Sequence, residues 1–194
     1  MLYLNQLDYP HIPYNHNMAH GGVPEERRCV ATSGCGMCSL CMIVGNMTMG
    51  TLPLEECVKL TEDLGANMEL GSKLTITGPV VAERFGLTYS NTNDVNVLID
   101  HLRRGGKAVA NVGGDREGGY IGLFSHGGHY IVVDSIDGNE VCILDPSYKE
   151  GKFDEEGRQG KVKVCYPYLY CDVALLAKDA ENRDPAYHLF MRKK

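Results

Sequence analysis

The spacing of apolar residues changes near residue 106, and this change is the strongest constraint on the fold. Before it, apolar residues recur at helical spacing in LPLEECVKLTEDLG (52–65) and DVNVLIDHLRRGG (94–106). After it, apolar and polar residues alternate in KAVANV (107–112), HYIVVDSI (129–136) and EVCILD (140–145). Helices followed by antiparallel strands predict an α+β fold in a single domain, residues 1–194, with a helical part at about 30–105 and a sheet part at about 106–194.

Capping residues and glycines set the expected boundaries of the other elements. Asp94 suits an N-cap and Gly105 a stop for the second of these helices, and a shorter helix is expected from Thr77 to Gly86. Further strands are expected at 162–166 and 187–192, with a helix or turn at 172–178 between them. The glycine-rich segment 113–128 predicts a mobile loop directly before His129.

Cys35 has the surroundings of a nucleophile. It lies in SGCGMCSLCMIVGNM (33–47), where a glycine-rich turn runs into residues at helical spacing. A sulfur at a helix N-terminus is close to unpaired N–H groups and to the positive end of the dipole, which favour a thiolate and can bind an oxyanion. Gly34 and Gly36 are expected to let a substrate backbone approach closely.

A thiolate nucleophile needs a base and a group that orients it, and His129 and Asp145 are the candidates. His129 begins a strand, and Asp145 ends the strand expected to pair with it around Asp137-Gly138-Asn139. A three-residue turn places His129 and Asp145 on the same face, whereas a two-residue turn without a bulge places them on opposite faces. His126 is a rival base, less well held inside the loop.

Four motifs in this order, LNQLDYP, GCG, GGHYIVV and ILDP, resemble the papain-like cysteine peptidases. The nearest branch is that of the bacteriocin-leader (double-glycine) peptidases and their stand-alone C39-like relatives. The resemblance implies a papain-like fold, with Cys35 as nucleophile, His129 as base and acid, Asp145 as orienter and Gln6 as side-chain donor to the oxyanion hole. It covers roughly residues 4–146. The fused membrane transporter usual in leader peptidases has no counterpart, and Gln6 lies farther from Cys35 than in them.

The expected activity is therefore that of a thiol-dependent peptidase or amidase that acts on peptide or amide bonds and requires no cofactor. Acyl transfer to another amine is compatible with the same residues. A peptidase fold used only for binding is a further alternative, which the intact triad disfavours.

A second class of function is a non-enzymatic metal or iron–sulfur protein, because Cys35, Cys38 and Cys41 have the C-x₂-C-x₂-C spacing of ferredoxins. On a helix, however, the first and third of these cysteines are about 600° apart and point to different sides. The irregular segment with His11, His16 and His20 also suggests a metal, although solvent-exposed loop histidines are the more ordinary interpretation. We expect structural roles for His101, on the polar side of its helix, and for His188.

Charge and apolar content exclude some partners. A net charge of −6 and a pI near 5.6 disfavour nucleic acid and anionic membranes as partners. The stretch 29–54 is uncharged, but it contains four glycines, Asn46 and a proline, so no transmembrane segment is expected. Eight cysteines, several in apolar strings, favour a reducing and hence cytoplasmic compartment, but a leader removed by secretion would leave no trace.

Overall fold

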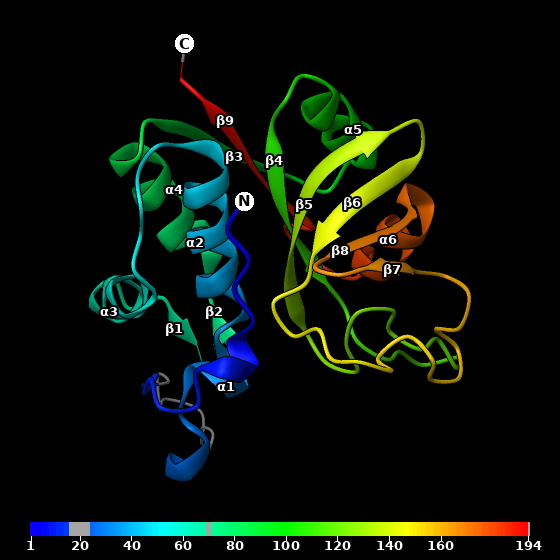
Figure 1. Cartoon of the computed structure of the whole chain (residues 1–194), viewed down its shortest axis with the longest axis horizontal. Helices are drawn as coiled ribbons and strands as arrows, with labels where there is room; N and C mark the ends of the chain where they lie inside the picture. The colour runs from blue at the N-terminus through cyan, green and yellow to red at the C-terminus, as the bar shows by residue number, and fades with distance from the viewer. Residues whose placement is uncertain (16–23, 69–70, 194) are drawn as a thin grey trace.

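The 13-residue helix α2 (Cys35–Met47) lies at the centre of the protein in a computed structural model that describes residues 1–15, 24–68 and 71–193. Its residues are buried on every side from Cys35 to Val44, as expected of a helix that is apolar all round. It packs on the strand β5 (His129–Asp137) and on the helix α3 (Leu54–Asp63) (Figure 1). The helix that begins with Cys35 is therefore the element that joins the helical part to the sheet.

The sheet has seven strands, and each pairs antiparallel with its neighbours. Five of the strands agree with the sequence prediction, whereas β3 and β8 were not expected. Because β3 lies in the sequence of the helical part but pairs with β9, the expected boundary near residue 105 does not separate helices from strands. In spatial order the strands are β3 (Leu87–Thr92), β9 (Tyr187–Arg192), β4 (Lys107–Val112), β5, β6 (Glu140–Leu144), β8 (Tyr168–Asp172) and β7 (Lys163–Cys165).

Each face of the sheet carries its own apolar core. Helices α2 and α4 (Leu74–Arg84) cover one face, with α3 packed on α2, and Val109 and Val132 contribute to this core. Helices α5 (Val95–Arg103) and α6 (Val173–Ala180) cover the other face (Figure 1). Alternate residues of a strand point to opposite faces, which explains why consecutive residues are apolar and buried in the middle of β4 (108–110) and of β5 (131–133).

The predicted helix ends are correct for α3 and α5, whereas for α4 the stop at Gly86 is correct and the start is wrong. The Asp94 carboxylate caps α5 by accepting a hydrogen bond from the Asn96 N–H at 2.8 Å. Gly105, with φ of 85°, follows the end of the same helix. Helix α4, however, begins at Leu74 rather than Thr77, so Pro79 lies in its interior. The loss of one backbone hydrogen bond at Pro79 is offset by the packing of α4 on β3.

A β-bulge sets the register between β5 and β6. Asp137 pairs with Glu140, so the turn has two residues and not three. The ladder then skips Asp134, which adds one residue to β5. Beyond the bulge Val132 lies opposite Leu144, the register that the three-residue turn would have produced. The expectation that His129 and Asp145 share a face is thus met through the bulge.

The segment 113–128 forms an irregular loop that is anchored to α6. The carboxylate of Asp179, which is fully buried, accepts hydrogen bonds from the Leu123 N–H at 2.7 Å, the Phe124 N–H at 3.3 Å and the Tyr120 hydroxyl at 2.9 Å. These contacts fix the middle of a segment that the sequence predicted to be mobile.

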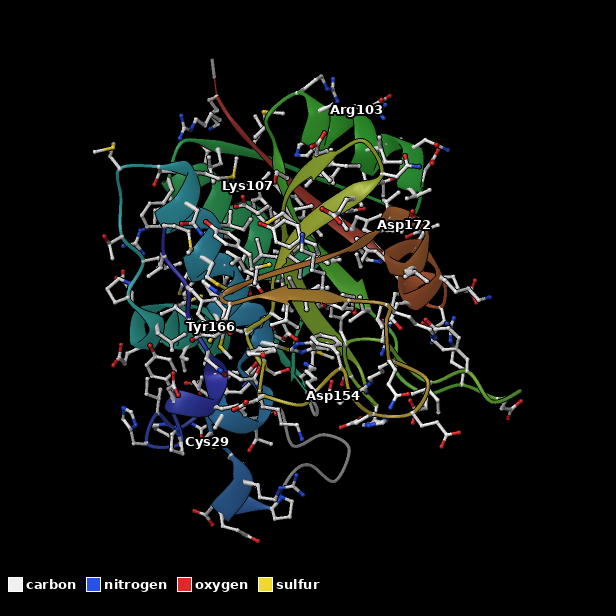
Figure 2. The ribbon with its side chains drawn as sticks, turned by 45° about the vertical axis from the view of Figure 1, so that its right-hand side comes forward. Cys29, Arg103, Lys107, Asp154, Tyr166 and Asp172 are labelled. Atoms are coloured by element: carbon white, nitrogen blue, oxygen red, sulfur yellow. The ribbon has the colours of Figure 1, made fainter. Side chains whose placement is uncertain are left out.

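Charged side chains such as Arg103, Asp154 and Asp172 lie at the outer surface (Figure 2). Lys152 and Arg158 are exceptions, since they are only 5% and 2% exposed. Among the described residues, every helix is too short or too polar to cross a lipid bilayer.

We expect Asp179→Ala to lower the free energy of unfolding by about 3 kcal/mol, because it leaves buried N–H groups without an acceptor. Urea denaturation followed by circular dichroism measures this change. Asp154→Ala, which removes an exposed carboxylate, is the matched control and should leave the midpoint unchanged. Equal midpoints for the two variants would show that Asp179 does not anchor the loop.

Candidate active site

Cys35, His129 and Asp145 come together from three separate elements. Cys35 is the first residue of α2, His129 is the first residue of β5, and Asp145 directly follows β6. His129 Nε2 lies 2.8 Å from Asp145 Oδ1, and the imidazole and the Cys35 thiol line the same cleft, close enough for each to shift the pKa of the other. Because Nε2 is used by the carboxylate, Nδ1 is the ring nitrogen left for the sulfur.

The surroundings of the pair favour the thiolate and the imidazolium. Burial opposes charge on Cys35, but the hydrogen bond and charge of His129 and the backbone N–H groups of Tyr130 and Gly36 lower the pKa of the thiol below its ordinary value. Burial also opposes charge on His129, yet the Asp145 carboxylate and Cys35 raise the pKa of the imidazole to about 9. The two shifts together favour an ion pair near neutral pH.

Lys152 and Ser147 complete the site, and sequence reasoning missed both. Lys152 Nζ lies 2.6 Å from Asp145 Oδ2 and 2.9 Å from Ser147 Oγ. The Ser147 N–H donates to Asp145 Oδ1 at 2.8 Å, and Ser147 Oγ lies 3.0 Å from His129 Nε2. Both residues belong to the polar stretch PSYKEGK, where a lysine ordinarily faces solvent, so no pattern in the sequence distinguishes them.

The cation of Lys152 keeps Asp145 ionised although the carboxylate is fully buried. Burial raises the pKa of Asp145, but the charges of Lys152 and His129 and their hydrogen bonds lower it well below its usual range. Asp145 is therefore a permanent anion at neutral pH, which the imidazolium of His129 requires.

Gln6 is buried beside the site, between the segment before Cys35 and the segment after Asp145. Its Nε2 donates to the Ala31 carbonyl at 2.9 Å, and its backbone N–H donates to the Pro146 carbonyl at 2.6 Å. The second hydrogen of Nε2 is not used by these contacts. Its expected role as an oxyanion donor stays a prediction.

The two glycines that flank Cys35 serve packing inside the protein, which corrects the expectation that they make room for substrate. A Cβ on Gly34 would come within 2.4 Å of Val30, and one on Gly36 within 2.2 Å of Ser72 Oγ. The absence of these Cβ atoms lets α2 approach its neighbours closely.

The other described histidines have different partners. His126 is exposed, and its two ring nitrogens lie 2.9 Å from Asp115 and Glu155. His101 is buried and bonds to the Phe190 carbonyl at 2.9 Å, so it does not lie on a polar helix face as expected. His188 is buried against the Tyr89 hydroxyl at 2.8 Å. His11 packs beside Tyr9, while His16 and His20 lie outside the described residues.

The three cysteines of the C-x₂-C-x₂-C motif lie on one helix and do not form a cluster. Cys38 and Cys41 are fully buried in the core. Burial raises the pKa of the Cys38 thiol. The pKa of the Cys41 thiol is raised by the neighbouring Cys57 and by burial. Within residues 1–15, 24–68 and 71–193, no group of three or more His, Cys, Asp or Glu side chains is arranged to hold a metal ion. All eight cysteines are described, and each has a free thiol.

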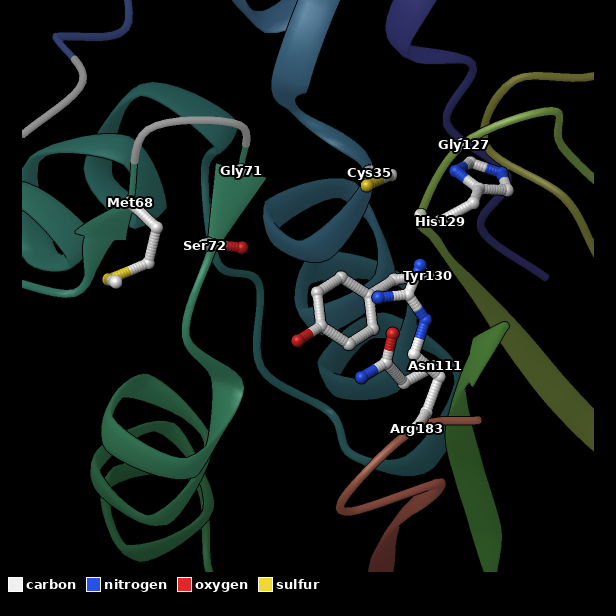
Figure 3. Close-up of a pocket in the computed structure, with 10 residues that line it drawn as sticks. Cys35, Met68, Gly71, Ser72, Asn111, Gly127, His129, Tyr130 and Arg183 are labelled. Atoms are coloured by element: carbon white, nitrogen blue, oxygen red, sulfur yellow. The ribbon is translucent and has the colours of Figure 1, made fainter. Parts of the chain in front are cut away.

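An open cleft of about 540 Å³ leads to Cys35 and His129. Met68, Gly71 and Ser72 line the side next to the helices, and Asn111, Tyr130 and Arg183 line the side next to the sheet (Figure 3). From loop 113–128 only Gly127 and Gly128 reach this cleft. A substrate lying along the cleft would pass directly over the sulfur.

We expect Lys152→Met to destabilise the protein by about 3–5 kcal/mol at neutral pH, because it leaves the buried Asp145 carboxylate without its cation. In the wild type the folded-state pKa of Asp145 lies below the unfolded value of about 3.9, so its contribution to stability is present above that pH and is lost as the pH falls. The variant should therefore lose less stability than the wild type between about pH 5 and pH 3.

Urea denaturation at a series of pH values measures both effects. Lys178→Met, which removes a lysine paired with Glu181 at the surface, is the control and should have little effect. If Lys152→Met matched the wild type in stability and in its pH dependence, the ion pair would have no energetic role.

Comparison with known proteins supports the fold. No protein-family model matches the sequence, and no curated protein matches it. Among solved structures, one from Bacillus anthracis carries the provisional description of a C39-like peptidase. It superposes with a TM-score of 0.53 at 11% sequence identity, and the match covers 95% of this chain and 96% of that chain. The protein therefore has the α+β, papain-like fold of a C39-like peptidase, as the four sequence motifs predicted.

Proposed function

We propose that this protein is a thiol-dependent hydrolase, a cysteine peptidase or amidase, with Cys35 as its nucleophile. The observation that carries the proposal is that Cys35 and His129 line the same open cleft while His129 is hydrogen-bonded to the buried carboxylate of Asp145. A buried structural triad would not need an opening to solvent, and a surface cysteine would not need an oriented imidazole.

The first half of the reaction forms a thioester. The Cys35 thiolate attacks the carbonyl carbon of a peptide or amide bond, and the carbonyl oxygen becomes an oxyanion. Backbone N–H groups in the first turn of α2 and the free hydrogen of Gln6 Nε2 are the proposed donors to this oxyanion. The imidazolium of His129 then gives its proton to the leaving amine as the C–N bond breaks.

The second half restores the enzyme. Neutral His129 takes a proton from a water molecule, which attacks the thioester and releases the carboxylic acid and the Cys35 sulfur. Asp145, held by Lys152, fixes the imidazole orientation and stabilises its charged form throughout. No step requires a cofactor.

We expect Cys35 to be alkylated by iodoacetamide with a pH midpoint below the value of about 8.5 for a free cysteine. The measurement uses a Cys29→Ser/Cys165→Ser background, which removes the two cysteines that are not buried. Cys35→Ala in that background should abolish both the fast labelling and the cleavage of a fluorogenic peptide library. Fast labelling that persists in Cys35→Ala would rule out Cys35 as the activated thiol.

We expect the rate of peptide cleavage to fall at alkaline pH near the pKa of about 9 that belongs to His129. Asp145→Asn removes the charge that raises this pKa, so the alkaline limb should move to lower pH and the maximum rate should drop by at least about 100-fold. Lys152→Met retains the carboxylate and is the matched control, whose alkaline limb should not move down. An unchanged limb in Asp145→Asn would remove Asp145 from the proposed mechanism.

A further inference from the structure

A cation lies in the same cleft as the reactive thiol. Arg183, in the segment between α6 and β9, lines the cleft together with Cys35 and His129. Its guanidinium points toward the cavity beside Tyr130 and Asn111 (Figure 3).

The guanidinium is held in place by the sheet. Arg183 Nε donates to the Val112 carbonyl, at the end of β4, at 3.2 Å. A Cβ on Gly128 would come within 2.6 Å of Arg183 Nη2, so this position must be glycine for the guanidinium to lie where it does. The side chain is half-buried and pre-positioned, which lowers the entropy cost of binding a ligand to it.

The charge of Arg183 is not neutralised within the described part of the chain. No described carboxylate lies within ion-pair distance of it, and the two acidic residues near it in sequence are already used. Glu181 pairs with Arg116 at 2.7 Å and with Lys178 at 2.6 Å. Asp184 accepts a hydrogen bond from Asn93 at 2.9 Å. Both terminal nitrogens of the guanidinium therefore remain available to an anion.

A second polar group in the cleft also lacks a partner. Ser72 is only 7% exposed, and its hydroxyl makes no hydrogen bond within residues 1–15, 24–68 and 71–193. It stands beside Gly36, next to Cys35, and its oxygen points into the cleft in Figure 3. A buried hydroxyl without a partner costs about 1–3 kcal/mol, so a polar group of a ligand is expected to satisfy it.

We infer that the cleft selects substrates with a carboxylate close to the bond that is cut, and that Arg183 binds this carboxylate while Ser72 bonds to the substrate backbone. The inference rests on the proposed function, because it gives the substrate class of the same site. An acidic side chain and a free C-terminal carboxylate present the same group, and the experiment separates them.

The first test compares two alkylating reagents that differ only in charge. Iodoacetate carries a carboxylate and iodoacetamide is neutral, and the ratio of their rates at Cys35 reports the local preference for an anion. In the Cys29→Ser/Cys165→Ser background, we expect Arg183→Gln to lower this ratio about five- to tenfold and Arg183→Lys to retain most of it. Arg103→Gln, which removes an exposed arginine on α5, controls for net charge and should leave the ratio unchanged.

The outcomes distinguish the two proposals. If neither reagent labels Cys35 faster than it labels denatured protein, the proposed function fails. If both reagents label Cys35 rapidly and the ratio is the same in Arg183→Gln, the carboxylate site fails and the proposed function stands.

The second test uses fluorogenic peptides in matched pairs. One arm compares Glu with Gln at each position flanking the cut bond, and the other compares a free C-terminus with a C-terminal amide. We expect the wild type to prefer the acidic member in one arm at least tenfold, and Arg183→Glu to reverse this preference in favour of the neutral member of the same pair. Cleavage by the wild type without preference in either arm would overturn the inference.

Discussion

A buried carboxylate, Asp145, holds the candidate site together. A fully buried anion is tolerated only when it is paired and hydrogen-bonded, and Asp145 has Lys152 on one oxygen and His129 on the other. With Cys35 as a thiolate, the four groups Cys35, His129, Asp145 and Lys152 alternate between anion and cation, and their charges sum to zero. This neutrality would allow the proposed ion pair of Cys35 and His129 to lie within a largely apolar fold.

The first residues of the chain support this arrangement from a great distance in sequence. The Tyr3 hydroxyl donates to the Asp145 carbonyl at 2.7 Å, and Asn5 Nδ2 donates to the Tyr148 carbonyl at 2.8 Å. With the bond from the Gln6 N–H to Pro146, these contacts run along the segment that carries Asp145 and Ser147. The N-terminal segment therefore stabilises the position of the residues that orient His129.

The sequence predicts what depends on local spacing and misses what depends on distant partners. Strands 107–112 and 187–192 and the Asp94 cap were predicted correctly, because alternation and capping are local properties. The register that places His129 and Asp145 on the same face was expected from a three-residue turn. It arises instead from a bulge at Asp134, which nothing in HYIVVDSI indicates. Lys152 could not be identified, because its burial follows from how a polar loop folds back onto Asp145.

The position of β9 in the sheet has a consequence for how the protein is made. This strand lies between β3 and β4, although β3 ends at Thr92 and β4 at Val112, long before β9 begins at Tyr187. During synthesis, β3 and β4 leave the ribosome long before β9, the strand that lies between them. The edges of β3 and β4 that pair with β9 therefore remain unpaired until β9 has been made. The nascent chain cannot complete its sheet, or bring Arg183 to the thiol, until residue 192 has emerged.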